Sequence, residues 1–195
     1  MNNRDTGAEQ LIKETAKRIF FAEGKFNATT QDIADAAGVT RTLVNYYFRS
    51  KDILFKKVYI EAMGDVKNRL DEVLASDLPL KKKIENAIDV FYADLMAFPY
   101  KESFLIQEIN LHGFDSSEKS SSPEISNFLK EVQEAINKGL IKQMKPTNFM
   151  MNLFSLMAYP FLTRPLFTRL FETSEAEFDT LLLERKKMIM DVLFP

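Results

Sequence analysis

The residues whose types and spacing could do chemistry gather in one short stretch, residues 30–48, with the sequence TQDIADAAGVTRTLVNYYF. One face of a predicted helix in its second half carries four polar side chains at helical spacing: Arg41, Thr42, Asn45 and Tyr46. A guanidinium, a hydroxyl, an amide and a phenol are groups with which proteins contact base edges and phosphates. The stretch therefore predicts a nucleic-acid-binding surface.

Two short, closely crossing helices are needed to present that face. Such a pair requires a small residue in the first helix and a glycine in the turn, and Ala34 and Gly38 occupy these places. Apolar residues fall where the inward side should be: Ile33, Ala37, Val39, Val44 and Tyr47. The spacing predicts a helix-turn-helix unit; the alternative is a plain helical hairpin whose polar face is only solvated.

The rest of the chain is also helical in its periodicity, with about nine helices, no strand and no internal repeat. Short helices precede residue 50 and long ones follow it, and Pro160 and Pro165 should bend or break the helix that opens at Pro146. We expect an all-α protein in which a three-helix helix-turn-helix domain, residues 1–50, is joined to a C-terminal helical bundle, residues 51–195.

Residues 9–57 resemble the N-terminal DNA-binding domain of the TetR/AcrR family of bacterial transcriptional regulators. The family pattern is matched, in chain order, by Phe20, Gly24, Ala28-Thr29-Thr30, Ile33-Ala34, Ala37-Gly38-Val39, Tyr47-Phe48 and Ser50-Lys51. The resemblance implies that Thr29 caps the second helix and that Lys51 binds phosphate. It implies a DNA-contacting set of Thr29, Thr30, Thr40, Arg41, Thr42, Leu43, Asn45, Tyr46, Tyr47 and Lys51. Asn45 and Leu43 depart from the commonest pattern, so the operator sequence does not follow.

Composition and charge agree with this division into a DNA-binding N-terminal part, residues 1–50 (the head), and a separate C-terminal part, residues 51–195 (the body). Of the net charge of −2, residues 1–60 contribute +3 and the remainder −5. The chain has no cysteine and one histidine, which excludes disulfides, thiol nucleophiles and multi-histidine metal sites. We therefore expect no enzyme activity, no metal and no cofactor. No signal peptide opens the chain and its most apolar run is short, so we expect a cytoplasmic protein without membrane association.

The predicted body offers two further sites. An apolar pocket with a few polar anchors is expected among Met63, Phe91, Tyr92, Leu95, Phe104, Gln107, Asn110, His112, Phe128 and Met157, although a filled core would use the same side chains. A self-complementary dimer interface is expected at Phe167, Phe171, Phe178, Leu182, Ile189 and Val192; here too the alternative is the chain's own core.

Together these patterns favour a homodimeric transcriptional regulator. We expect a repressor that binds a palindromic operator in double-stranded DNA and is released by a small, largely apolar effector. The alternative is a helical protein–protein interaction module that binds no operator.

Overall fold

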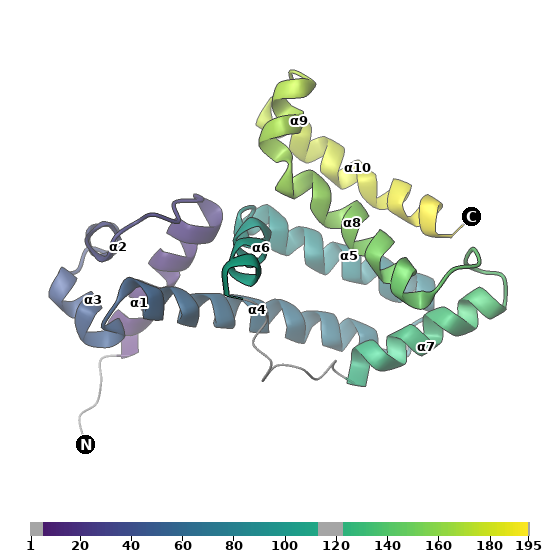
Figure 1. The fold of residues 1–195 in the computed structure, drawn as a ribbon, viewed down its shortest axis with the longest axis horizontal. Coiled ribbons are helices and arrows are strands. Elements are labelled where there is room, and N and C mark those ends of the chain that lie inside the picture. Colours follow the sequence, from purple (N-terminus) through teal and green to yellow (C-terminus); the bar gives the residue numbers. More distant parts are fainter. Residues whose placement is uncertain (1–5, 113–122, 195) are drawn as a thin grey trace.

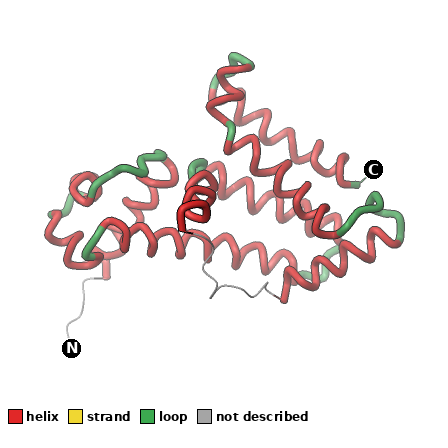
Figure 2. The backbone as a smooth tube through the Cα atoms, in the orientation of Figure 1, coloured by secondary structure: helices red, strands yellow, loops and turns green. Residues whose placement is uncertain are grey.

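The computed structural model describes residues 6–112 and 123–194, and within these ranges the regular structure is entirely helical (Figure 2). The α-helices are α1 Thr6–Lys17, α2 Thr30–Ala37, α3 Arg41–Phe48, α4 Lys51–Ala75, α5 Leu80–Ala97, α6 Lys101–His112, α7 Pro123–Asn137, α8 Pro146–Leu162, α9 Arg164–Leu170 and α10 Glu175–Leu193. A five-residue π-helical segment, η1 (Arg18–Ala22), continues α1. The all-α prediction is confirmed.

The described residues form one helix more than the sequence predicts, because α8 and α9 are separate. Pro160 lies inside α8 and Pro165 lies in the first turn of α9. Between them Thr163, with φ −105° and ψ 12°, ends the first helix. A proline has no N–H to donate to the preceding turn, which is why this segment cannot remain one continuous helix.

The N-terminal helices pack around a hydrophobic cluster that we call the head core. Its buried members are Ile12, Ala16, Ile19, Phe20, Phe21, Ala28, Ile33, Ala34, Val44, Phe48, Leu54, Val58, Ala62 and Phe104. Three of them lie on the first half of α4, so the head core extends past residue 50. Phe104, from α6, is the member most distant in sequence.

A second cluster, the body core, fills the space between α5, α7, α8 and α10. Its buried members are Ile84, Ile88, Phe91, Tyr92, Leu95, Phe128, Val132, Ala135, Ile136, Ile141, Phe149, Leu153, Met157, Phe161, Phe178, Leu182, Ile189, Met190 and Leu193. In Figure 1, α4 runs as a single rod from the head, at its N-terminal end, to the body, where it contacts α5 and α7.

The corner between α5 and α6 provides a second attachment of the head to the body. The Phe104 ring lies 4.0 Å from the Phe55 ring, centroid to centroid, and the Tyr100 N–H donates to the Phe21 carbonyl oxygen at 3.0 Å. Gly24 makes the close approach possible. A Cβ there would lie 2.9 Å from the Tyr100 ring, and φ is +67°, which disfavours any side chain.

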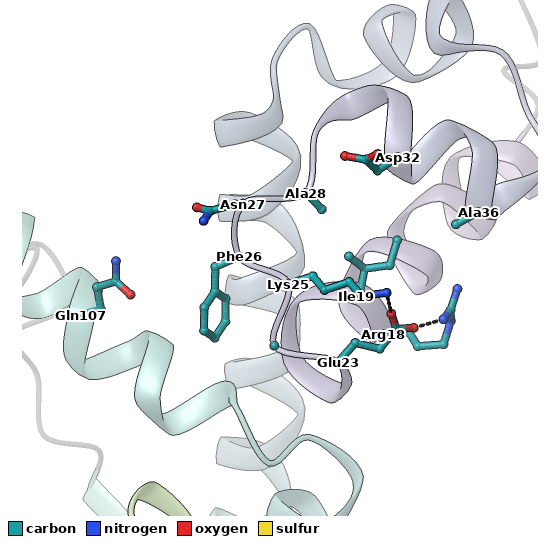
Figure 3. Close-up of a pocket in the computed structure, with 11 residues that line it drawn as sticks. Arg18, Ile19, Glu23, Lys25, Phe26, Asn27, Ala28, Asp32, Ala36 and Gln107 are labelled. Atoms are coloured by element: carbon teal, nitrogen blue, oxygen red, sulfur yellow. Dashed lines mark hydrogen bonds and ion pairs between the residues drawn. The ribbon is translucent and has the colours of Figure 1, made fainter. Parts of the chain in front are cut away.

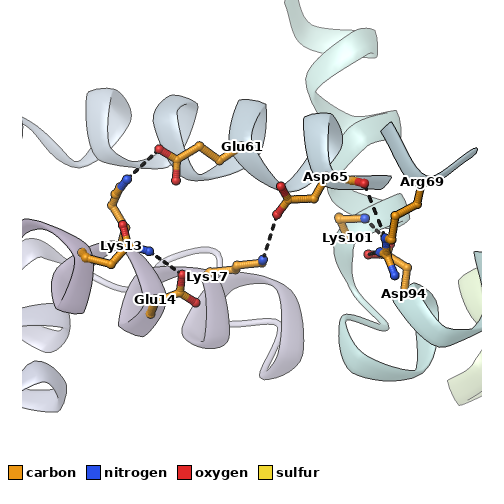
Figure 4. Close-up of polar contacts among 9 residues, drawn as sticks. Lys13, Glu14, Lys17, Glu61, Asp65, Arg69, Asp94 and Lys101 are labelled. Carbon is orange, nitrogen blue, oxygen red and sulfur yellow. Dashed lines mark hydrogen bonds and ion pairs between the residues drawn. The ribbon is translucent and has the colours of Figure 1, made fainter. Parts of the chain in front are cut away.

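A buried ion pair fixes this same corner (Figure 4). The Lys101 ammonium, fully buried at the start of α6, donates to the Asp94 carboxylate of α5, which Arg69 of α4 also reaches at 3.4 Å. Burial lowers the pKa of Lys101, and the Asp94 carboxylate opposes that shift. Breaking such a pair would leave a buried charge uncompensated, so the pair holds α4, α5 and α6 in register.

No helix within the described ranges is both long enough and apolar enough to cross a membrane.

Candidate nucleic-acid interface

The helix-turn-helix unit is built on local hydrogen bonds at the two helix starts. Thr29 caps α2: its hydroxyl oxygen accepts from the Asp32 N–H at 3.2 Å, and the Asp32 carboxylate accepts from the Thr29 N–H at 2.7 Å. These reciprocal bonds form a capping box. Hydrogen bonding from the Thr29 backbone lowers the pKa of Asp32. Thr40 caps α3 in the same way, because its hydroxyl oxygen accepts from the Leu43 N–H.

The turn between α2 and α3 depends on Gly38. Its φ of +67° lies in the left-handed region that glycine adopts without strain, as the sequence predicts. The Val39 N–H then donates to the Ala34 carbonyl oxygen at 3.0 Å. Ala34 itself is fully buried, so a larger side chain at this position would hold the two helices apart.

The inward and outward faces of α3 are divided as predicted. Val44 and Phe48 are buried in the head core, and Tyr47 is half-buried beside them. Four polar side chains on the other side are exposed: Arg41, Thr42, Asn45 and Tyr46. Tyr46 is 63% exposed, which is unusual for so large an aromatic residue without a partner surface.

The remaining residues of the predicted DNA-contacting set lie at the edges of this face. Thr29 and Thr40 are exposed at the starts of α2 and α3, and Thr30 and Leu43 are half-buried. Lys51 is also half-buried at the start of α4, and its Nζ donates to the Phe26 carbonyl oxygen at 2.6 Å. Lys51 thus ties α4 to the loop before α2, a structural contact that sequence reasoning missed.

The positive charges of the head are divided between two regions. Those on α1, η1 and the adjoining loop, together with Lys57 of α4, lie beside carboxylates, in the ion pairs Lys13–Glu61, Lys17–Asp65, Lys57–Glu9, Arg18–Glu23 and Lys25–Glu23 (Figure 4 shows the first two). In contrast, Arg41 and Arg49, at the two ends of α3, pair with no carboxylate of the described residues. Among the described residues, positive charge without a carboxylate partner therefore lies at both ends of α3 and, at Lys51 and Lys56, on the first turns of α4. Phosphate binding requires such charge.

Arg49 is a candidate contact that the sequence reasoning missed. It follows α3 directly, is exposed, and has φ +59° and ψ −38°, a conformation that a non-glycine residue adopts only at a cost in free energy. Its N–H still donates to the Asn45 carbonyl oxygen, so the backbone at Arg49 stays attached to the last turn of α3. The signal available in the sequence was its position one residue after Tyr47-Phe48.

An open cleft of about 730 Å³ lies between the head and α6 (Figure 3). Its walls come from η1, the loop before α2, two residues of α2 (Asp32 and Ala36) and one residue of α6, Gln107. Arg18 and Lys25 both reach Glu23 there, and these contacts, with Lys25 the larger effect, lower the pKa of Glu23. With its charges neutralised internally, this cleft is distinct from the α3 face.

The structure separates the residues of the predicted effector pocket. Phe91, Tyr92, Leu95, Phe128 and Met157 are buried together in the body core. Phe104 belongs to the head core instead, Met63 is half-buried, Gln107 and Asn110 are exposed, and the His112 side chain lies outside the described residues. This arrangement differs from the prediction because the start of α6 packs into the head. Helical periodicity alone does not show which core a helix joins.

The predicted dimer residues are also divided. Phe178, Leu182 and Ile189 are at most 4% exposed because they face the body core of their own chain, so they offer no surface to a partner. Phe171 and Val192 are 58% and 57% exposed, and Phe167 is half-buried, stacked on Phe171. For the three buried residues, the alternative of core packing is the correct one.

Comparison with known proteins identifies this geometry. Residues 12–58, which span the helix-turn-helix unit and the start of α4, match the family model described as bacterial regulatory proteins, tetR family. The helix-turn-helix part of the chain thus matches the TetR family, and the predicted resemblance is confirmed. The chain is a DNA-binding transcription regulator.

Individual relatives agree with this family over most of the chain. An uncharacterised HTH-type transcriptional regulator of Bacillus subtilis, YhgD, is 24% identical over 146 residues, which cover 71% of this chain and 74% of that protein. A TetR-family transcription regulator from Marinobacter aquaeolei has the same fold, with a TM-score of 0.66 at 15% identity over 100% of this chain and 99% of the other. The fatty acid degradation regulator FadR from Bacillus halodurans gives 0.62 at 15% identity, covering 93% and 94%. These relatives are regulators, which agrees with the prediction that this chain is not an enzyme.

Proposed function

We propose that this TetR-family regulator is a homodimeric repressor that binds a palindromic operator and releases it when a small, largely apolar effector binds the body. Residues 1–50 supply the DNA contacts in this proposal, and residues 51–195 supply the dimer interface and the effector site. The observation that carries it is the α3 face: exposed Arg41, Thr42, Asn45 and Tyr46 on a helix whose other side is buried. The arginines at its two ends pair with no carboxylate in the described part of the chain.

Exposed apolar side chains on the last three helices support a dimer. Large hydrophobic residues there are 42–66% exposed: Met151, Phe154, Tyr159, Leu166, Leu170, Phe171, Leu181, Leu183, Met188 and Val192. Figure 1 shows α8, α9 and α10 side by side. Large exposed apolar side chains on neighbouring helices are typical of protein–protein interfaces, and a two-fold axis would pair such a surface with itself.

Such a dimer would present two copies of α3 to successive major grooves. Half-sites should then be about 34–36 Å apart, one helical turn, or somewhat further, and the operator should be a palindrome. The test is selection of bound DNA from a random pool, followed by affinity measurements at several salt concentrations. Recovery of a palindrome whose binding weakens steeply with salt supports the proposal. Sequences without two-fold symmetry would contradict the dimeric arrangement.

An effector can release the operator only if it binds more tightly to a form of the dimer whose two heads are not spaced to fit both half-sites. The head joins the body through α4 and through the α5–α6 corner, so a ligand that displaces either element changes the position of α3. A coupling of about 1–3 kcal/mol, or roughly 5–150-fold in operator affinity, is typical of such switches. Operator affinity measured with and without a compound that binds the body tests this part of the proposal.

A further inference from the structure

Arg185, on the buried face of α10, has one evident structural role. Pro160 has no N–H, so the carbonyl oxygen four residues earlier, that of Leu156, loses its helical partner. The Arg185 Nη2 group donates to this oxygen at 3.1 Å. Arg185 lies on the α10 face that carries Leu182 and Ile189, and it thereby compensates for the proline inside α8.

This contact leaves part of the guanidinium without a partner. The Nε atom of Arg185 is buried and makes no hydrogen bond, and no carboxylate of the described residues pairs with the positive charge. The hydroxyl oxygen of Tyr92, on α5, is likewise buried; it lies beside the same guanidinium but makes no well-formed hydrogen bond. Buried polar groups in folded proteins are almost always hydrogen-bonded, so two neighbouring exceptions indicate a missing acceptor.

The two side chains lie close together in an apolar environment. Burial raises the pKa of Tyr92, and Arg185 opposes that rise through its positive charge and through a hydrogen-bonding contact with the hydroxyl. The Tyr92 ring packs edge-on against Phe161, with the centroids 5.5 Å apart, and Met157 and Met190 belong to the same core. Methionine side chains rearrange at little cost, so this core can adapt to an apolar ligand.

We propose that Tyr92 and Arg185 bind the carboxylate of an otherwise apolar effector. The Arg185 Nε–H and the Tyr92 hydroxyl both donate to the carboxylate oxygens, and the carboxylate neutralises the guanidinium charge. The rest of the ligand lies among the aromatic and methionine side chains between α5, α8 and α10. This inference rests on the proposed function in taking the ligand to be the effector, and it adds the chemical class: an apolar monocarboxylate.

The test compares carboxylates with neutral molecules of the same shape. Benzoate and octanoate are titrated into the full-length protein by calorimetry, beside benzyl alcohol and 1-octanol. Arg185→Gln removes the charge but retains an N–H donor for the Leu156 carbonyl, and Tyr92→Phe removes only the hydroxyl. Lys187→Gln, an exposed position on the same helix, is the matched control for the loss of one positive charge.

We expect the wild type and Lys187→Gln to bind at least one carboxylate in clear preference to its alcohol. Arg185→Gln should weaken that binding about 10- to 150-fold, as the loss of a charged hydrogen bond implies, and Tyr92→Phe about 2- to 10-fold. If Arg185→Gln does not fold, Arg185→Lys keeps the charge and should retain the preference. Equal binding of alcohol and carboxylate by the wild type, or unchanged carboxylate binding by Arg185→Gln, overturns the inference.

Operator affinity measured in the same solutions separates this inference from the proposed function. A carboxylate that binds through Arg185 without changing operator affinity supports the site and contradicts effector-driven release. Conversely, if an alcohol releases the operator as effectively as the corresponding carboxylate, this result supports effector-driven release and overturns the carboxylate site.

Discussion

Arg41 is the first residue of α3, exposed and without an ion-pair partner among the described residues. An arginine in the major groove binds guanine through two hydrogen bonds. We therefore expect Arg41→Ala to weaken operator binding by about 1–3 kcal/mol and to relax the preference at one base pair. Binding to a selected operator and to its single-base variants measures both effects. Arg18→Ala is the control, since Arg18 is already paired with Glu23; equal losses in the two variants would contradict the assignment.

Arg49 has a strained backbone, and its charge pairs with no carboxylate within residues 6–112 and 123–194. Glycine adopts a φ of +59° without the cost of about 1–3 kcal/mol that other residues incur in such regions. We expect Arg49→Gly to raise the melting temperature and yet to weaken binding to all DNA sequences, with a salt dependence reduced by about one phosphate contact. Arg49→Lys, which keeps the charge, should bind DNA more tightly than Arg49→Gly. A stabilised Arg49→Gly variant that binds DNA as well as the wild type would exclude a role for the side chain.

Whether a feature of the site can be predicted from the sequence depends on how far apart in the chain the interacting residues lie. The exposure of Arg41, Asn45 and Tyr46 follows from helical spacing alone, and the structure agrees with it. The bond from Lys51 to the Phe26 carbonyl joins residues 25 apart in sequence, so no local pattern predicts it. The same holds for the Arg185 contact with Leu156, which depends on how two helices cross.

At the scale of the element, two helices begin with complete capping boxes: Thr29 with Asp32 at α2, and Ser174 with Glu177 at α10. Loss of a threonine cap costs about 1 kcal/mol, so we expect Thr29→Ala to lower the free energy of unfolding by that amount. Chemical denaturation measures it. Thr147→Ala, at an exposed threonine inside the first turn of α8, serves as the comparison and should have a smaller effect.

Both capping carboxylates should also make stability depend on pH. Hydrogen bonds from the cap residues lower the pKa of Asp32 and of Glu177, whose ordinary values are 3.8 and 4.5. A lowered pKa in the folded state means stability that is present above the ordinary value and is lost as pH falls through the folded value. We expect Asp32→Asn and Glu177→Gln each to flatten the loss of stability on acidification below about pH 5, measured by denaturation at a series of pH values. If stability depends on pH in both variants as it does in the wild type, the capping carboxylates contribute nothing to that dependence.

Local signals account for most helix boundaries, and distant contacts account for the exceptions. Gly38, Thr40, Ser50 and Ser174 each act within four residues of their position, so the sequence predicts the helix starts and the turn. The π-helical turn of η1 has no such signal. Phe104 sits on an ordinary helical stripe, and its packing against the aromatic rings of the head, Phe21, Phe55 and Tyr59, assigns the start of α6 to the head core.

At the scale of the whole molecule, the exposed face of α8–α10 should hold two chains together. Met188 is 58% exposed on α10, and Leu140, in the connection between α7 and α8 and outside these three helices, is 60% exposed. We expect Met188→Glu to shift the protein from dimer to monomer, because a carboxylate in an apolar interface lacks a partner. Leu140→Glu should remain dimeric. Light scattering at micromolar concentration distinguishes the two, and a monomeric wild type would contradict the interface.

The placement of Phe104 in the head core bears on how such regulators can be recombined. A chimera that joins residues 1–62 of this protein to the body of a relative would lose its own Phe104 and Tyr100. Phe21, Phe55 and Tyr59 would then meet an α5–α6 corner shaped for another head. Exchange of operator specificity between family members would therefore require the corner, residues 98–104, to be transplanted with the head, so the functional module is discontinuous in the gene.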